Sequence, residues 1–262
     1  MVINEIFLNP TVKKVFFQIT FPNLFSIESK IGDYQSEIIN YFPQSSFSYK
    51  LPTIFFTDVG PEGKIVQPPQ GIDDKADKIW QFKSESNYNL NISSGSLSLD
   101  SQLHKTYNNP SSEIRFRDII KKTLEPFFKI IRIPRLNRIG LRYIDHCTAF
   151  LPDPLTDSNF KNWYNTVFPL DRFSIEKTKE MGFRVVSKQK DYHIIYYEHI
   201  ILDDNVNYII DFDGFAENVP SESYLTIADE LHTIISEEFE RTIKKPVFDL
   251  MRTPIEVNKD VK

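Results

Sequence analysis

The chain has 262 residues, of which 40% are hydrophobic and 26% charged, and its formal net charge at pH 7 is −5. These proportions are typical of a soluble globular protein that is large enough to bury a core. The single cysteine, Cys147, excludes a disulfide framework and a zinc site built from cysteines, and it favours a reducing, cytoplasmic setting.

The N-terminal segment MVINEIFLNP has an acidic residue and no basic stretch ahead of an apolar run, unlike a signal peptide. No apolar run approaches the roughly 18 residues that a membrane span needs, so no membrane contact is expected. The 22 Phe and 12 Tyr, beside only 8 Gly, favour β-sheet.

The first half of the chain predicts strands that alternate with two helices. Residues 15–21 alternate as in a strand, and residues 26–41 carry apolar side chains at helical spacing. A short strand is predicted at residues 51–56, and the stretch 58–78, rich in glycine and proline, predicts a long loop that could serve as a flap. Strands follow at 79–86, 88–92 and 96–99, and then a helix at 111–131 that Pro126 should bend or end early.

The second half predicts elements in a similar order. A strand is predicted at residues 137–147 and a shorter helix at about 157–168. Strands follow at 182–189, 192–202 and 206–213, with a hairpin turn at 203–205. A long helix at 223–243 closes this half, and Pro246 should end it.

These elements predict an α+β fold made of two β-α-β(3–4)-α repeats. Each repeat would form a curved, mostly antiparallel sheet that a long helix covers, because a sheet with one apolar face needs a cover. The two repeats, at residues 1–134 and 135–248, would join through their first strands into one saddle-like unit, with a flexible tail at 249–262.

Four segments, NPTVKKVFFQITF, WQFKSES with NLNISSGSLSL, NRIGLRYID and LHTIISEEFERTI, carry a resemblance to a known family. With R-I-G-L-R-Y as the most specific motif, the chain resembles the sporadically distributed, uncharacterised prokaryotic proteins of similar length. Lys14 stands where that family has an acidic residue. The resemblance implies no activity or site residue, and it implies an accessory role in defence against mobile elements.

Charge is unevenly distributed along the chain. Residues 191–240 contain thirteen acidic residues and no Lys or Arg, so the rest of the chain carries a net charge of +8. Such a block is usually a solvated surface, but it could also meet a protein with a basic surface. The candidate contact residues for such a partner are Asp203, Asp204, Glu230, Glu237, Glu238 and Glu240. The segment at 129–142 is basic and could bind nucleic acid through Lys129, Arg132, Arg135, Arg138 and Arg142.

The strand at residues 137–147 carries most of the candidate chemistry. Because successive side chains point to opposite faces, His146 cannot work with its neighbours Asp145 and Cys147. A cysteine in such a strand is usually a small core residue. Arg138 and Arg142 would lie about 13 Å apart on one face, where they could hold carboxylates of the acidic half or straddle a phosphate backbone. Gly140 suggests a close approach of a helix or of the partner strand.

The remaining candidates are histidines and aspartates. His193 and His199 share a face but lie about 20 Å apart, too far to share a metal. Asp211 and Asp213 lie about 7 Å apart, a spacing that suits a divalent cation or an acid–base pair but more often marks a solvent-facing strand edge. His232 is expected at the boundary of the core.

Three hypotheses for the function follow. No cofactor and no metal ion is expected. The first is a non-enzymatic binding or adaptor protein whose acidic half engages a protein partner. The second is a nucleic-acid or nucleotide binder that uses the basic segment. The third is an enzyme with a site between the halves, where Asp211, Asp213, His193 and the 58–78 loop converge.

Overall fold

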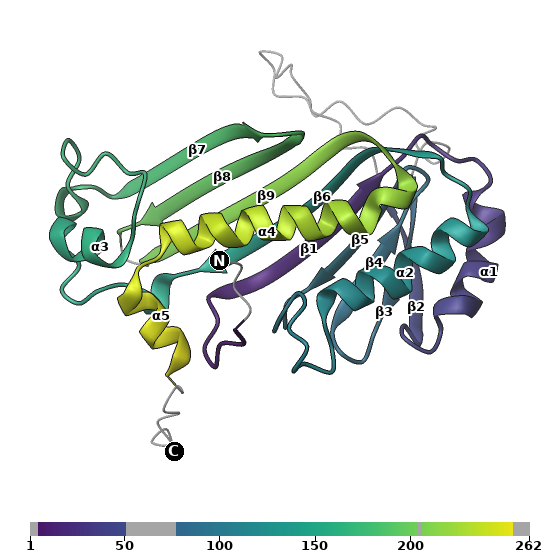
Figure 1. The fold of residues 1–262 in the computed structure, drawn as a ribbon, viewed down its shortest axis with the longest axis horizontal. Coiled ribbons are helices and arrows are strands. Elements are labelled where there is room, and N and C mark those ends of the chain that lie inside the picture. Colours follow the sequence, from purple (N-terminus) through teal and green to yellow (C-terminus); the bar gives the residue numbers. More distant parts are fainter. Residues whose placement is uncertain (1–4, 51–76, 204–205, 254–262) are drawn as a thin grey trace, which may run out of the picture.

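The computed structural model describes residues 5–50, 77–203 and 206–253 (Figure 1). The strands are β1 (Val12–Thr20), β2 (Gln44–Lys50), β3 (Asp77–Lys83), β4 (Tyr88–Ile92), β5 (Ser96–Ser101), β6 (Arg135–His146), β7 (Glu180–Gln189), β8 (Tyr192–Ile201) and β9 (Asn207–Pro220). The α-helices are α1 (Ile27–Ile38), α2 (Phe116–Ile130), α3 (Asp157–Trp163), α4 (Tyr224–Thr242) and α5 (Lys245–Arg252). The strand predicted at 51–56 and residues 58–76 of the loop predicted at 58–78 lie outside the described residues, whereas residues 77 and 78 belong to β3.

All nine strands belong to one antiparallel sheet in the order β2-β3-β4-β5-β1-β6-β9-β8-β7. The fold is α+β, but the prediction of two sheets that each grip a helix is wrong. The reason is that β1 pairs with β5 on one side and with β6 on the other, with Phe17 opposite Leu141. This pairing satisfies main-chain groups that two separate sheets would leave open at their edges.

The two sides of the β1–β6 pair have a similar strand order. Next to the first strand of each half lies its last strand, β5 beside β1 and β9 beside β6. The internal repeat and the division at residue 134 stay predictions.

The helices lie on one face of this sheet (Figure 1). α4 contacts β6 and β9, and α1 packs against α2 on the first half. Aromatic rings of the helices pack against rings of the strands. Examples are Tyr34 of α1 with Phe82 of β3, and Phe160 of α3 with Tyr208 of β9. The side chains of this covered face form the hydrophobic core.

The opposite face is defined by the register of the strands. The row Phe16, Arg142, Asp213, Ile195 and Val186 runs across it from β1 to β7. We call it the uncovered face, because none of the helices in the described residues packs on it.

Two prolines lie within helices, and Pro126 does not end α2 early. Pro126 lies inside α2, which continues to Ile130, because the buried neighbours Leu124 and Phe127 hold the helix against the core. Pro246 begins α5 rather than only ending the helix before it. The expected flexible tail therefore starts as helix, with Met251 buried, while residues 254–262 lie outside the described part.

The helix predicted at 157–168 is shorter, and β9 is longer than predicted because it continues beside β6 to Pro220. Within the described residues, none of the helices combines the length and the apolar character needed to cross a membrane.

Candidate functional site

Two ion pairs join β6 and β9 on the uncovered face. Nε of Arg142 donates to Asp211 at 2.8 Å, and a second guanidinium nitrogen donates to the same carboxylate. Arg138 donates to both oxygens of Asp213 at 2.9 Å. The prediction that these arginines hold carboxylates of the acidic half is confirmed. The prediction of a strand edge at the two aspartates is wrong, because β9 lies between β6 and β8.

Gly140 makes room for the side chain of Arg138. A Cβ atom at Gly140 would lie 2.6 Å from Nη1 of Arg138. The close approach therefore comes from this side chain, and the prediction that a helix or the partner strand approaches Gly140 is wrong. The guanidinium lies 4.5 Å from the ring centre of Phe215, and the ring of His193 stacks on the same phenylalanine at 5.1 Å. The R-I-G part of the motif thus supports one packed group on the uncovered face.

The rest of the basic segment does not extend this group. Lys129 of α2 contacts Glu37 of α1 at 3.2 Å, and Arg135 donates to the main-chain oxygen of Asn218. Arg132 is exposed and forms none of the ion pairs in the described residues. The five basic residues therefore lie in different surroundings, and three of them are paired with acids.

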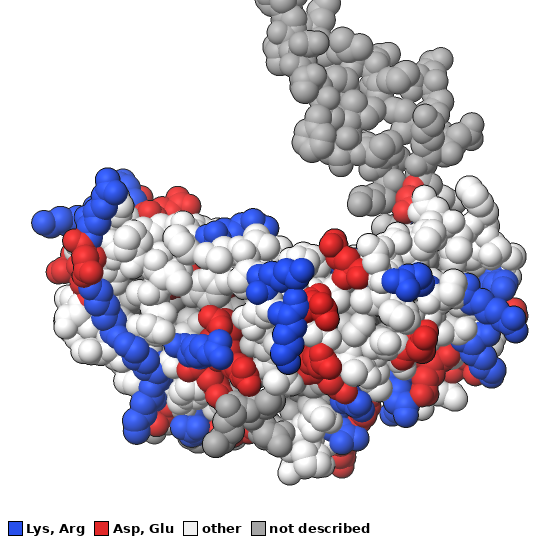
Figure 2. Space-filling model, turned by 45° about the horizontal axis from the view of Figure 1, so that its top comes forward, with Lys and Arg blue, Asp and Glu red and all other residues white. Residues whose placement is uncertain are grey.

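The acidic block is also largely paired within the molecule. Glu237 and Glu238 contact Arg241 at 3.6 and 3.0 Å. Tyr192 donates to Glu230, Lys179 contacts Asp203 at 3.4 Å, and Asp204 lies outside the described residues. Glu240 lies on α4 and is partly exposed. On the face that Figure 2 shows, basic and acidic side chains lie side by side rather than in separate fields.

The remaining candidates from the strands lie as their alternation predicts. Asp145 and Cys147 are buried on the covered face, and burial raises the pKa of the Cys147 thiol, which makes it a poor nucleophile. His199 bonds to Glu180 at 2.8 Å, far from the stacked His193. Arginines engage both Asp211 and Asp213, and most of the loop expected to complete an enzyme site with them lies outside the described residues.

A cavity of about 90 Å³ lies on the covered face, between β6, α4, α5 and the segments that precede β1 and α2. Its lining combines aromatic and aliphatic side chains with polar groups. The polar lining groups include Thr11, His104, Tyr107, Tyr143, Asp145, His232 and Ser236. We take this cavity as a second candidate site, beside the packed group on the uncovered face.

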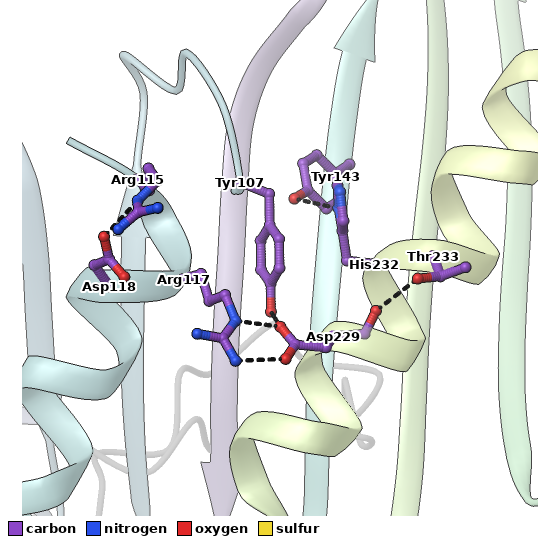
Figure 3. Close-up of polar contacts among 8 residues, drawn as sticks. All are labelled: Tyr107, Arg115, Arg117, Asp118, Tyr143, Asp229, His232 and Thr233. Atoms are coloured by element: carbon purple, nitrogen blue, oxygen red, sulfur yellow. Dashed lines mark hydrogen bonds and ion pairs between the residues drawn. The ribbon is translucent and has the colours of Figure 1, made fainter. Parts of the chain in front are cut away.

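A chain of polar contacts (Figure 3) reaches one wall of the cavity, which Tyr107, Tyr143 and His232 line. Arg117 of α2 holds Asp229 of α4 through two hydrogen bonds of 2.7 Å, and the Tyr107 hydroxyl donates to the same carboxylate at 2.9 Å. The Tyr107 ring stacks on His232 with centroids 4.1 Å apart, and His232 Nδ1 lies 3.2 Å from the Tyr143 hydroxyl. This wall joins residues from both halves of the chain.

The histidines of the cavity are neutral at neutral pH. Burial lowers the pKa of His104 to about 3 and that of His232 to about 4. His232 is partly exposed, as its predicted boundary position requires. His104 is 7% exposed, and its Nδ1 has no hydrogen-bond partner among the described residues.

Asp145 is the buried acidic group of the cavity. It is 3% exposed and accepts a hydrogen bond of 2.7 Å from the Thr11 hydroxyl. Burial raises its pKa to about 7, against the opposite effect of the Thr11 bond. Its carboxyl group is therefore poised to change charge near neutral pH.

Sequence reasoning found part of this site and missed the rest. It placed Asp145 on the opposite face from His146 and His232 at the core boundary. It missed His104 and Tyr107, which precede α2 in a stretch without periodicity, and it gave Tyr143 no functional role. Within the described residues, three or more His, Cys, Asp or Glu side chains nowhere gather closely enough to hold a metal ion.

Comparison with models of known protein families found no match, and neither did a search of curated proteins. The family resemblance of the four segments, and the defence role that it implies, stay predictions.

Proposed function

We propose that this chain is a binding protein that contacts a protein partner through the uncovered face of its sheet. The observation that carries the proposal is the residue content of this face. Phe16, Tyr197 and Phe215 share it with Arg138, Arg142 and Arg184, as the strand register requires. Aromatic residues and arginine are the types enriched at the centres of protein interfaces.

The charges of this face favour a protein over a nucleic acid. Binding to a phosphate backbone draws its affinity from cations that release counterions. Arg138 and Arg142 are each engaged by an aspartate, so they offer less free charge to phosphates. Paired charges around aromatic side chains suit a mixed protein surface better.

The acidic block is less suited than the uncovered face to contact the partner. Internal pairs lower the charge that Glu237 and Glu238 present to a basic partner. Val186, in contrast, is 51% exposed on the uncovered face, next to the exposed Arg184.

The test is co-purification of the tagged full chain from cells that naturally make it. Arg184→Glu combined with Val186→Asp should abolish capture of the partner that the wild-type chain retains. Charge reversal of Glu237, Glu238 and Glu240 to lysine on α4 is the matched control and should leave capture unchanged. Loss of the partner with the α4 variant alone would contradict the proposal, and so would a captured species that nuclease treatment removes.

A further inference from the structure

The buried carboxyl groups of the molecule differ in how many ion pairs and hydrogen bonds they form. Four carboxyl side chains are buried in the described residues: Asp100, Asp145, Glu198 and Asp211. Asp211 has Arg142 and Asp100 has Lys14, 3.7 Å away, together with the Asn89 amide at 3.1 Å. Glu198 accepts four hydrogen bonds, from the hydroxyls of Tyr196, Tyr208 and Thr166 and from the Val167 main chain.

Asp145 differs from the other three. Its partner is the Thr11 hydroxyl, and in the described part of the chain neither Lys nor Arg forms an ion pair with it. Buried carboxylates are normally paired or fully hydrogen-bonded, because desolvation of an unpaired charge costs far more than one hydroxyl bond returns. Asp145 therefore lacks a cation, and it faces a cavity.

The rest of the cavity wall suits an organic cation. Phe7, Tyr107, Tyr143, Phe212 and Phe239 line it beside Asp145. Aromatic faces attract cations, and aromatic cages are a known way of binding alkylammonium groups. The exposed residues Glu5 and Lys105 also line the cavity, so it opens to solvent on their side.

The size of the cavity and a second buried polar group limit which ligands the cavity can hold. A volume of about 90 Å³ is smaller than the roughly 150 Å³ cavity that binds benzene, so it admits a head group rather than a whole ring system. The buried His104 also lines the cavity, and its Nδ1 has no hydrogen-bond partner among the described residues. It could bond an N–H group or a water that accompanies the cation.

We propose that this cavity binds an alkylammonium group against Asp145, presented by a small amine or by a lysine side chain. The ammonium supplies the missing partner of the carboxylate, and the aromatic rings surround its alkyl groups. The site lies on the covered face, so it is separate from the contact proposed for the uncovered face.

The site has a defined dependence on pH. Since burial raises the pKa of Asp145 to about 7, the cation must displace a proton below that pH. Affinity should fall up to about tenfold for each pH unit below 7. Of the other groups that line the cavity, His104 and His232 stay neutral there, Glu5 is paired with Arg252, and Lys105 lies at the exposed side of the cavity.

The test compares a cation with its neutral isostere on the full chain by calorimetry at about pH 8. Choline should bind at least about tenfold more tightly than 3,3-dimethylbutan-1-ol, which has the same shape without the charge. Asp145→Asn should remove this preference while leaving the weak binding of the alcohol unchanged. The affinities of methylammonium and Nα-acetyllysine methylamide are measured in the same way. Their comparison shows whether the cavity prefers a small amine or a lysine side chain.

The proposal would be overturned if choline and the alcohol bind equally, or if none of the four probes binds at millimolar concentration. The cavity would then hold only water. If Asp145→Asn does not fold, Phe239→Leu replaces it, because losing one ring should weaken choline several-fold. An unchanged choline affinity in this folded variant would equally refute the cage.

Discussion

Three titratable side chains around the cavity respond to pH in opposite directions. The pKa of His104 lies at about 3 and that of His232 at about 4, below the ordinary value of 6.5, and that of Asp145 lies at about 7, above 3.8. As pH falls below 6.5, the unfolded chain binds protons at these histidines before the folded protein does, so the histidines make stability fall. Asp145 does the reverse, because between pH 3.8 and 7 the folded protein holds a proton that the unfolded chain has lost.

These opposite signs give a prediction with an internal control. Over about pH 4.5 to 6.5, His104→Leu should reduce the slope of unfolding free energy against pH by up to about 1.4 kcal/mol per unit. Asp145→Asn should increase the same slope by a similar amount, since it removes the contribution that falls with rising pH. Urea unfolding across this range measures both slopes, and two variants with the wild-type slope would contradict the charge states described above.

The packing of Arg138 over Gly140 gives a second prediction for single residues. Gly140→Ala would push the guanidinium off Phe215 and weaken its contact with Asp213, at a cost of about 0.5–1 kcal/mol. If the ion pair is the cause, the cost should shrink when Asp213→Asn is already present. A double-mutant cycle measures this coupling, and costs that simply add would show that Gly140 acts in some other way.

At the scale of elements, the close contact of α4 with β9 depends on Gly214. A Cβ atom there would lie 3.0, 3.1 and 3.2 Å from the terminal carbons of Ile194, Leu231 and Ile235. A larger side chain must therefore push the helix away from the sheet, because a packed core has little room to relax.

We predict that Gly214→Val lowers the unfolding free energy by about 1–3 kcal/mol. Gly182→Ala on β7 is the control, because a Cβ atom there would make an ordinary contact of 3.4 Å with His199. Chemical denaturation of both variants decides the matter, and a Gly214→Val protein within about 0.5 kcal/mol of wild type would mean that α4 packs less tightly than described.

The elements also show which features were predictable from sequence. Alternation along residues 15–21 and 137–147 correctly separated the buried side chains of Phe17 and Leu141 from the other face, because strand periodicity is local. The junction of the halves through their first strands was predicted, and the pairing of β1 with β6 confirms it. Alternation could not show that all these strands form one continuous sheet, because strand pairing joins residues far apart in the sequence. The cavity was missed for the same reason: its wall combines Tyr107, Tyr143 and His232, and only their spatial contact gives them a shared chemistry.

At the scale of the whole molecule, two connections make the halves depend on one another. The β1–β6 ladder runs through the middle of the sheet, and Arg117 of α2 holds Asp229 of α4 on the covered face. Separating the halves would open two central strand edges and expose the core beneath α2 and α4, so we expect the chain to unfold as one cooperative unit.

The two tryptophans allow this expectation to be tested, because Trp80 lies on β3 and Trp163 on α3, at opposite ends of the sheet. Trp80→Phe and Trp163→Phe each leave one fluorescent reporter, in the second and in the first half respectively. In a cooperative molecule each reporter should show the same denaturation midpoint as the circular dichroism signal of its own variant. Adding Gly214→Val, which acts in the second half, should lower both midpoints equally. A reporter on β3 that keeps its midpoint in that background would show that the halves unfold independently despite the shared sheet.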